Sequence, residues 1–287
     1  MIENVAIVGT GLIGASFGLA LRAAGFTGAI CGVSSPPAVA AAVEAGAVDR
    51  AASLAEAVAS ADLVFLAQPI GRIIDTLRHL DPLLKPGALV TDAGSTKCEI
   101  ADAALQCIRR GTFVGGHPMA GKESRGAAAA DAALFRGRTW VLTPADAADL
   151  NTPLAHRFIH WLHAIGARPI SMDAAEHDRV VALTSHLAQL ASTALAATVA
   201  ENVPAERLDV AGSGLADMSR LALSSYELWR DIVATNTGAI EKALTTYIQK
   251  LDHIRENLRT RQLQEEFERG AKLAATVRGS STRGNLG

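Results

Sequence analysis

Short apolar runs alternate with alanine-rich helical stretches over residues 5–171. This alternation is typical of parallel strands that are covered by helices. The predicted strands cover residues 5–8, 29–33, 63–67, 89–92, 112–115, 139–142 and 168–171. The predicted helices between them cover residues 12–24, 37–45, 70–80 and 97–109. Three of these helices are followed by a glycine that is expected to cap them in the left-handed conformation, at Gly25, Gly46 and Gly111.

The pattern changes after residue 172, because no further Val/Ile run follows and apolar residues recur at helical spacing. We expect a helix over residues 173–202, a looser segment over 212–214 and long helices from Tyr226 onward. The predicted fold is therefore an α/β domain over residues 1–172 followed by an all-α domain over residues 173–277.

One helical face of the second domain is apolar although the surrounding stretch is rich in charge. Its members recur at steps of three and four residues: Ile240, Leu244, Tyr247, Ile248, Leu251, Ile254 and Leu258. Such a face either packs within its own domain or forms a dimer interface, and the pattern leaves both open. The last residues, 278–287, are rich in glycine, serine and arginine and are predicted to be disordered.

Composition and charge narrow the classes of function. The 27 basic and 29 acidic residues leave a formal net charge of -2, so no overall field attracts nucleic acid or an anionic membrane. Three cysteines without CxxC spacing indicate a reducing compartment. No apolar stretch approaches the roughly 18 residues of a membrane span, and the N-terminal apolar run is too short for a signal peptide. We expect a cytoplasmic protein with neither nucleic acid nor a membrane as its partner.

A glycine-rich motif, Gly9-Thr10-Gly11-Leu12-Ile13-Gly14, follows the first strand and opens the first helix. In this context Gly9 allows the tight turn, Gly11 lets the backbone approach a pyrophosphate, and Gly14 lets helix and strand pack closely. The phosphates would lie at the N-terminus of the helix, where Leu12 and Ile13 form the first turn. The motif predicts a dinucleotide cofactor, NAD or NADP.

The end of the second strand bears on the choice between these two cofactors. NAD enzymes commonly place an acidic residue there to hold the ribose 2′-hydroxyl, but here Ser34 and Ser35 follow the strand. Two hydroxyls and a helix that starts with proline could accept a 2′-phosphate, which a carboxylate would repel. Residues 34–43 contain no arginine to bind that phosphate. NADP is therefore only slightly favoured over NAD.

Two further strands end in polar segments that carry candidate chemistry, DAGSTK over residues 92–97 and GGHPMAG over residues 115–121. Ligands of open α/β sheets bind beyond the carboxyl ends of the strands, so Ser95 and His117 should face one crevice. Pro118 restricts His117 to extended geometry, which does not suit a core residue on a helix face. His117 is predicted to be catalytic, because an imidazole titrates near neutrality and can deprotonate a substrate hydroxyl. Ser95 either hydrogen-bonds the same hydroxyl or the nicotinamide amide, or caps the following helix.

The second domain supplies two candidates for substrate binding. His186 stands among apolar neighbours in TSHL, and Arg220 closes DMSR after a glycine-rich segment. The guanidinium of Arg220 has the fixed fork that fits a carboxylate. The alternatives are a hydrogen-bonded core histidine and a surface or domain-bridging arginine.

No metal site is predicted. His156, His160 and His163 share one face of a helix, but no carboxylate or cysteine lies nearby in sequence to complete a site. His177 and His186 are nine residues apart, which places them on opposite sides of a continuous helix, so they do not form a ligand pair.

The motifs GTGLIGAS, DAGSTK, GGHPMAGKESRG, TSHL and DMSR, followed by ELWRDIVATN, occur in this order over nearly the whole chain. Together they resemble the prephenate/arogenate dehydrogenase family of tyrosine biosynthesis. The resemblance implies a Rossmann-like domain followed by a helical domain through which a homodimer forms. It also implies NAD(P)-dependent oxidative decarboxylation of prephenate to 4-hydroxyphenylpyruvate, or of arogenate to tyrosine, with release of CO2.

The resemblance also implies roles for individual residues. His117 matches the histidine that hydrogen-bonds the ring 4-hydroxyl and helps to take its proton as hydride leaves that carbon. Ser95 matches the serine that touches the same hydroxyl, and Arg220 matches the carboxylate clamp. His186 matches a histidine that lines the substrate pocket, and Glu123 matches an acid present in some members.

Two positions depart from the family pattern. Gln189 stands where many relatives carry the second histidine of SHLPH, so any role of that histidine is lost or altered. Lys122 stands where many relatives carry a small polar residue, and it is expected to place an extra cation near the substrate pocket. An added cation would modestly favour prephenate, which has a keto side chain, over arogenate, which has an amino side chain. The preference between the two substrates stays open.

Two other functions are alternatives. A β-hydroxyacid dehydrogenase or an imine reductase has a similar architecture, but usually relies on a lysine or another donor from the helical domain. A non-catalytic NAD(P)-sensing protein would need only the cofactor half, so the joint presence of His117, Ser95 and Arg220 speaks against it.

Overall fold

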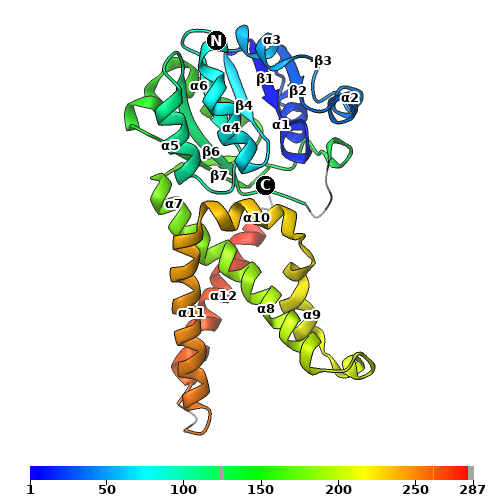
Figure 1. The fold of residues 1–287 in the computed structure, drawn as a ribbon, viewed down its shortest axis with the longest axis vertical. Helices are drawn as coiled ribbons and strands as arrows, with labels where there is room; N and C mark the ends of the chain where they lie inside the picture. The colour runs from blue at the N-terminus through cyan, green and yellow to red at the C-terminus, as the bar shows by residue number, and fades with distance from the viewer. Residues whose placement is uncertain (123, 125, 261, 284–287) are drawn as a thin grey trace. The chain divides into compact units, whose positions relative to one another are not determined.

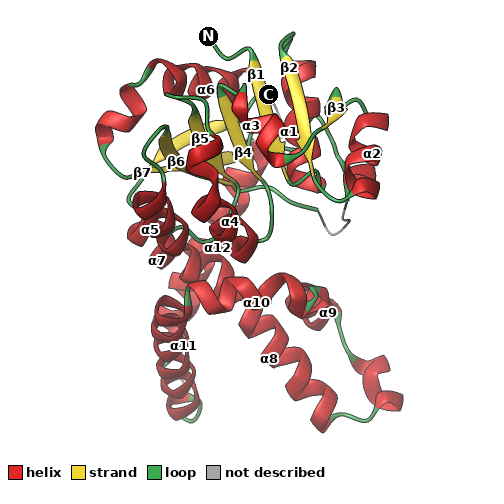
Figure 2. Ribbon diagram, turned by 45° about the horizontal axis from the view of Figure 1, so that its top comes forward, coloured by secondary structure: helices red, strands yellow, loops and turns green. Residues whose placement is uncertain are grey.

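The computed structural model of the protein describes residues 1–122, 124, 126–260 and 262–283. The chain forms two compact units, residues 1–177 and residues 178–283. The first unit is built around a β-sheet, and the second consists of helices joined by turns (Figure 1, Figure 2).

The sheet of the first unit has the strand order β3-β2-β1-β4-β5-β6-β7-β8. The strands are β1 (Asn4–Val8), β2 (Ala29–Val33), β3 (Arg50–Ala51), β4 (Leu63–Leu66), β5 (Leu89–Asp92), β6 (Thr112–Pro118), β7 (Thr139–Pro144) and β8 (Arg168–Ser171). Neighbouring strands run parallel except β6 and β7, which are antiparallel. The order reverses between β1 and β4, and doubly wound sheets bind ligands at such a reversal.

Helices cover both faces of this sheet: α1 (Leu12–Ala23), α2 (Pro36–Glu44), α3 (Leu54–Ala59), α4 (Ile70–Leu80), α5 (Cys98–Cys107) and α6 (Pro153–Ala164). Successive strand residues point to opposite faces, so one face contributes Phe65 of β4 and Trp140 of β7 to a core with Phe17 of α1 and Phe158 of α6. The ring centroids of Phe17 and Phe65 are 4.5 Å apart, and those of Phe17 and Trp140 are 5.8 Å apart. On the other face α4 and α5 lie side by side (Figure 1).

The predicted fold class is confirmed, and each predicted strand corresponds to an observed one. The sheet is not wholly parallel, however, since β6 and β7 are antiparallel. The sequence pattern could not predict this, because hydrophobic periodicity does not report strand direction. The short elements β3 and α3 were not predicted from the pattern. Gly25 and Gly46 adopt the expected positive φ, at 90° and 71°. Gly111 does not, and a Cβ there would lie 2.6 Å from the carbonyl oxygen of Ala88, so close approach of two strands explains this glycine instead.

The second unit begins within a continuous helical stretch that contains an irregularity. This helical stretch consists of α7 (Ala174–Val181), a π-helical turn (Ala182–His186) and α8 (Leu187–Asn202). The following elements are a 3₁₀ turn (Ala205–Val210), α9 (Ser213–Ser219), a second 3₁₀ turn (Arg220–Leu223), α10 (Tyr226–Thr235), α11 (Thr237–Asn257) and α12 (Gln264–Arg283). Single π-helical turns within α-helices are frequent at functional sites.

The stretch Ala174–Asn202 also bears on the prediction that no segment approaches a membrane span. Its 29 residues have a mean hydropathy of 1.4 in their most apolar window, which is enough by length and composition to cross a membrane. One such helix is weak evidence, because core helices of soluble proteins meet the same criterion. Its apolar surface is equally suited to packing against helices.

The apolar stripe of α11 divides into two parts. Ile240 is buried with Ala182 and Ala243 in the core of the second unit. Further along the helix, Ile248 and Leu251 are 55% and 47% exposed. Packing within the domain therefore accounts only for the first half of the stripe.

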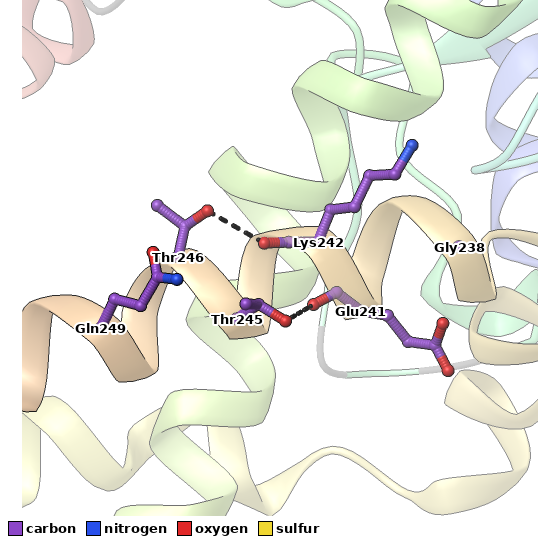
Figure 3. Close-up of a pocket in the computed structure, with 6 residues that line it drawn as sticks. All are labelled: Gly238, Glu241, Lys242, Thr245, Thr246 and Gln249. Carbon is purple, nitrogen blue, oxygen red and sulfur yellow. Dashed lines mark hydrogen bonds between the residues drawn. The ribbon is translucent and has the colours of Figure 1, made fainter.

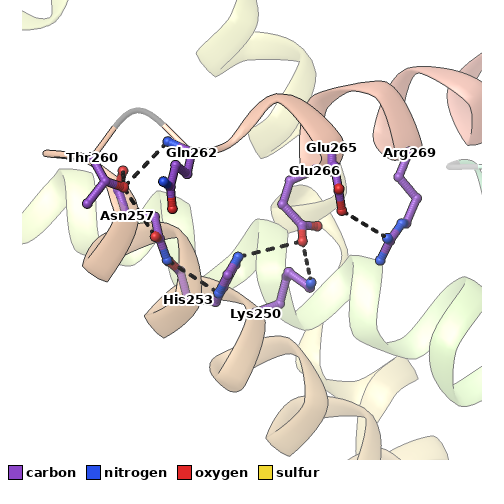
Figure 4. A network of polar contacts seen from close by, with 8 residues as sticks. All are labelled: Lys250, His253, Asn257, Thr260, Gln262, Glu265, Glu266 and Arg269. Atoms are coloured by element: carbon purple, nitrogen blue, oxygen red, sulfur yellow. Dashed lines mark hydrogen bonds and ion pairs between the residues drawn. The ribbon is translucent and has the colours of Figure 1, made fainter.

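The helices α11 and α12 are joined by polar contacts near their connection (Figure 4). The carboxylate of Glu266 accepts a hydrogen bond of 2.8 Å from Lys250, and the Nε2 atom of His253 lies 3.8 Å from it. The hydrogen bond from Lys250 lowers the pKa of Glu266 below its usual value. The helix α12 continues to Arg283, so residues 278–283, predicted to be disordered, are helical, whereas residues 284–287 lie outside the described part of the chain.

Candidate active site

The glycine motif forms a tight turn between β1 and α1. Gly9 has φ of 100°, and a Cβ there would lie 2.4 Å from the carbonyl oxygen of Ala67 after β4. A Cβ on Gly14 would lie 1.9 Å from the carbonyl oxygen of Gly9, so only glycine lets the helix approach the turn this closely. A Cβ on Gly11 would meet nothing within 4 Å. Gly11 therefore faces open space at the point where the fold binds phosphates.

The first turn of α1 fits an anionic ligand. Gly11 is its N-cap and makes no side-chain cap bond, and the turn carries no acidic residue. The first N–H groups of a helix lack intrahelical partners and bear partial positive charge, so a pyrophosphate is a suitable acceptor. Leu12 and Ile13 are half-buried at this turn. The residues present fit the pyrophosphate of a dinucleotide.

The segment after β2 presents two exposed hydroxyls. Ser34 and Ser35 are both exposed, and Ser35 is the N-cap of α2 without forming a side-chain cap bond. Proline occupies the start of α2, and its first turn carries no acidic residue. This N-terminus is electrostatically compatible with a phosphate group.

His117 lies in β6 and contacts a second histidine. Its Nδ1 atom is 2.8 Å from the Nε2 atom of His177 in α7. The two rings are inclined at 71°, His177 is 1% exposed, and His117 is half-buried. At this distance one of the two nitrogens carries a proton and the other accepts the hydrogen bond, so only one of these two atoms is protonated. His177 thereby fixes the orientation of the His117 ring.

Ser95 is half-buried in the loop between β5 and α5. The helix α5 begins at Cys98 with Lys97 as its N-cap and without a side-chain cap bond. The alternative of Ser95 as the cap of this helix is therefore wrong. The loop is held on both sides of Ser95, because the N–H of Gly94 and the Nζ atom of Lys97 both donate to Oδ2 of Asp92. The Oδ1 atom of Asp92 accepts a hydrogen bond from the N–H of Gly116 in β6, so the loop is tied to that strand.

His186 is buried at the end of the π-helical turn in the second unit, with 2% of its surface exposed. The Nδ2 atom of Asn236 lies 3.3 Å from its Nδ1 atom and 2.9 Å from the carbonyl oxygen of Asp178. Because a carbonyl oxygen only accepts, this atom of Asn236 is the amide nitrogen, and Nδ1 of His186 accepts its second hydrogen. His186 therefore carries a proton on Nε2. The ring of Trp229 packs edge-on against it, with centroids 5.7 Å apart.

Arg220 begins the second 3₁₀ turn of this unit and is exposed. Two side chains of α8 hold the backbone of that turn. The buried Gln189 donates a 2.8 Å hydrogen bond from Nε2 to the carbonyl oxygen of Leu221. The hydroxyl of Ser192 accepts a bond of 3.2 Å from the N–H of Ala222.

Lys122 lies after β6 and pairs with Asp131, with 2.8 Å between Nζ and Oδ2. The hydrogen bond from Lys122 lowers the pKa of Asp131, and the N–H of Ala133 adds to the effect. Asp131 is thus the ionic partner of Lys122, and the preference between the two substrates stays a prediction. Glu123 lies outside the described residues.

The histidines of α6 and a pocket on α11 include none of the predicted site residues. His156, His160 and His163 are exposed on α6, and the described residues contain no cluster of three potential metal ligands. A shallow pocket runs along one face of α11 and is lined by Gly238, Glu241, Lys242, Thr245, Thr246 and Gln249 (Figure 3). Its two threonine hydroxyls bond to carbonyl oxygens of the same helix. This pocket holds none of the predicted site residues.

The sequence pattern does not single out His177 and Asn236, which contact the predicted site residues His117 and His186 within their own units. His177 contacts a residue 60 positions earlier in the chain. Asn236 is the last residue of the motif ELWRDIVATN, which was the one available signal for it.

Two family models match consecutive parts of the chain. The model described as prephenate dehydrogenase, nucleotide-binding domain, matches residues 17–170. The model described as prephenate dehydrogenase, dimerization domain, matches residues 173–273.

Individual relatives agree with the family models. The chain is 30% identical over 281 residues to the prephenate dehydrogenase of Lactococcus lactis, covering 94% of this chain and 76% of that protein. It is similar to the crystal structure of prephenate dehydrogenase from Aquifex aeolicus in complex with hydroxyphenyl propionate and NAD+, with a TM-score of 0.84, 30% identity, and coverage of 97% and 98% of the two chains. It is also similar to Synechocystis arogenate dehydrogenase, with a TM-score of 0.79, 33% identity, and coverage of 98% and 99%.

Proposed function

The chain belongs to the prephenate dehydrogenase family, and we propose that it catalyses the oxidative decarboxylation of prephenate, arogenate or both. A nicotinamide dinucleotide, held by the turn at Gly9, Gly11 and Gly14, supplies the hydride acceptor. The hydroxyl proton moves to a base as a hydride leaves the ring carbon that bears the hydroxyl, the ring carboxylate then leaves as CO2, and the oxygen of the aromatic ring takes the proton back. The ring becomes aromatic, so the protein mainly has to orient it and to handle one proton and two carboxylates.

The contact between His117 and His177 is the observation that carries this proposal. With Nδ1 of His117 engaged by His177, Nε2 is the nitrogen that accepts the proton of the substrate hydroxyl. For Nε2 to act as a base, Nδ1 of His117 carries its proton and donates to Nε2 of His177. His177 thus selects the catalytically competent tautomer of His117.

The remaining site residues bind and orient the substrate in this proposal. Ser95 hydrogen-bonds the same hydroxyl, and Arg220 pairs with a carboxylate. His186 contributes to the substrate site in this proposal, and Asn236 holds its ring through the Nδ1 atom. Lys122, which pairs with Asp131, and Glu123, which lies outside the described residues, are proposed to contribute to substrate binding.

For the cofactor, we favour NADP slightly over NAD. The missing acid after β2 and the uncapped, proline-started N-terminus of α2 at Ser34 and Ser35 support this choice. Steady-state rates with both cofactors test it, and a strong preference for NAD would overturn it.

We also propose that the protein forms a homodimer through its helical domain and works in the cytoplasm. The exposed half of the α11 stripe and the match to a dimerization domain support the dimer. The balanced charge and the biosynthetic role of the named relatives support the location. Fractionation of cells that express a tagged chain would test the location.

The direct test of the activity is formation of the reduced cofactor with prephenate and with arogenate, each with NAD and NADP. Turnover of either substrate is expected, and no turnover in all four combinations would refute the proposal.

His117→Asn should lower turnover by about two to four orders of magnitude with cofactor binding nearly intact, the usual range for loss of an acid/base group. Arg220→Ala should raise the substrate KM strongly, and a loss of stability alone would contradict the clamp. His160→Asn, on the exposed face of α6, is the matched control for His117→Asn.

A further inference from the structure

On the side that faces β5, the backbone of Gly116, the residue before His117, is bound by side chains instead of by strand pairing, while on the other side Gly116 is in register with Leu142 of β7. Backbone pairing between β5 and β6 ends at Thr91 and Val114. Beyond this point the N–H of Gly116 donates a 3.0 Å hydrogen bond to Oδ1 of Asp92, and its carbonyl oxygen accepts one of 2.7 Å from Nζ of Lys97. Both backbone polar groups of Gly116, which belong to two successive peptide units, are therefore bound by one Asp–Lys pair.

The same pair also holds the loop that carries Ser95. Oδ2 of Asp92 accepts hydrogen bonds from Nζ of Lys97 and from the N–H of Gly94, the second at 2.7 Å. Ser95 lies between Gly94 and Lys97, so the chain is fixed on both sides of it. One buried ion pair thus connects the two segments that carry the proposed catalytic groups.

Close packing leaves this arrangement little freedom. The side chains of Asp92 and Lys97 are both 0% exposed. A Cβ on Gly116 would lie 2.4 Å from the carbonyl oxygen of Asp92, and a Cβ on Gly94 would lie 2.4 Å from the Cδ1 atom of Ile100. Glycine at both positions lets the backbone close around the pair.

Such a pair is a poor device for stability alone. Removing two charges from water is costly, and well-packed apolar residues of similar volume often stabilise a fold as well or better. What apolar residues cannot do is bind the backbone N–H and carbonyl oxygen of Gly116 in one fixed geometry. The pair therefore serves placement of the adjoining groups better than it serves stability.

We propose that Asp92 and Lys97 are positioning residues that set the orientation of His117 and Ser95 toward the substrate hydroxyl. The proposal rests on the proposed function, which assigns roles to His117 and Ser95 and none to this pair. A displacement of about 1 Å at a reacting group can lower the rate about a hundredfold. The pair is expected to affect the rate of the chemical step and not the binding of cofactor.

The test is the double variant D92N/K97M, which removes both charges together and leaves no buried unpaired ion. We expect it to fold, to bind the cofactor with a Kd within about twofold of wild type, and to lose about a hundredfold in kcat. The single variants D92N and K97M should lose kcat as well, with a larger fall in melting temperature, because each leaves one buried charge unpaired.

The matched control is D62N/K85M, the same substitutions in an Asp–Lys pair at the amino end of β4, whereas Asp92 lies at the carboxyl end of β5. Asp62 precedes β4 and its Oδ1 atom lies 2.6 Å from Nζ of Lys85. This variant should keep the wild-type kcat even if its melting temperature falls.

A second readout follows the histidines directly. In protein labelled with 15N-histidine, the ring resonances of His117 and His177 should shift in D92N/K97M and stay unchanged in D62N/K85M. Wild-type kcat together with unshifted resonances in D92N/K97M would overturn the proposal. If the wild-type protein turns over neither substrate, the proposed function fails, and the resonances still decide whether the pair positions His117.

Discussion

At the scale of single residues, the site depends on which ring nitrogen of each histidine is engaged. His117 uses Nδ1 for His177, and His186 uses Nδ1 for Asn236. In both cases the neighbour that contacts Nδ1 is itself buried. The sequence identifies His117 and His186 from their motifs, but the partners come from α7 and α10–α11, far away in the chain.

The role of His177 is testable by substitution. We expect His177→Asn to lower kcat by about 10- to 100-fold, because His117 loses the partner that holds its ring and tautomer. Cofactor affinity and melting temperature should change little. The measurement is steady-state kinetics with a cofactor titration, and His156→Asn, on the exposed face of α6, is the control. A wild-type kcat in His177→Asn would contradict the tautomer role.

At the scale of elements, Gln189 shows how a departure from a family motif acquires another role. The family resemblance places it at a histidine position, and its amide holds the carbonyl oxygen of Leu221 in the 3₁₀ turn that begins with Arg220. Its side chain therefore connects α8 to the proposed carboxylate clamp.

We expect Gln189→Leu to raise the substrate KM about tenfold, because the turn that carries Arg220 loses a buried hydrogen bond worth about 1 kcal/mol. The KM of the cofactor should not change. Thr193→Val is the control, since it removes only the second contact of the Gln189 amide, with Thr193 Oγ1 at 3.2 Å. An unchanged substrate KM in Gln189→Leu would separate this residue from the clamp.

The contact of Asp62 with Lys85, at the amino end of β4, is expected to depend on pH. Burial of the Asp62 carboxyl raises its pKa, but hydrogen bonds from Lys85 and from the N–H groups of Glu3 and Asn4 outweigh this, so the pKa lies below its usual value. A carboxyl with a lowered pKa stabilises the fold above its unfolded pKa, and this stability is lost as the pH falls through the folded pKa.

Asp62→Asn should therefore lower the free energy of unfolding by about 1–3 kcal/mol at neutral pH. The difference from wild type should shrink as the pH falls below about 4, the ordinary pKa of an aspartate. Urea denaturation at several pH values measures it. A difference that is the same at all pH values would show that the charge of Asp62 is not its cause.

The predicted elements show what a hydrophobic period can report. The strand 112–115 was predicted up to Gly115, but β6 continues through His117 to Pro118. The extension depends on antiparallel pairing of His117 with Val141 in β7, a contact between segments 24 residues apart that no local pattern contains. The π-helical turn at 182–186 was likewise not predicted, because a single irregular turn of five residues is too short to show a period of its own.

At the scale of the whole molecule, the helical domain has apolar surface that its own unit does not cover. Ile248 and Leu251 of α11 and Leu258, which directly follows this helix, are 55%, 47% and 61% exposed. A row of exposed apolar side chains on one helix is typical of an interface. The proposed homodimer would bury it.

We expect Leu251→Glu to shift the protein toward monomer, because a carboxylate in a dimer interface would be buried without a partner. Sedimentation velocity at several protein concentrations measures the shift. Leu105→Glu, at a leucine that is 63% exposed on α5, is the control and should leave the assembly unchanged. A dimer that persists in Leu251→Glu would move the interface away from this stripe.

The sequence by itself determined the α/β order of the first domain, the helical character of the second, the cofactor turn, and His117, Ser95, His186 and Arg220 as candidates. These features depend on local rules of periodicity and on residue types at fixed spacing, which a linear chain displays. The tertiary structure alone decided that β6 and β7 are antiparallel, that His177 and Asn236 hold the two histidines, and that a buried Asp92–Lys97 pair holds the peptide before His117. Each of these depends on a hydrogen bond between segments that meet only after folding, and no local pattern in the chain reports such a meeting.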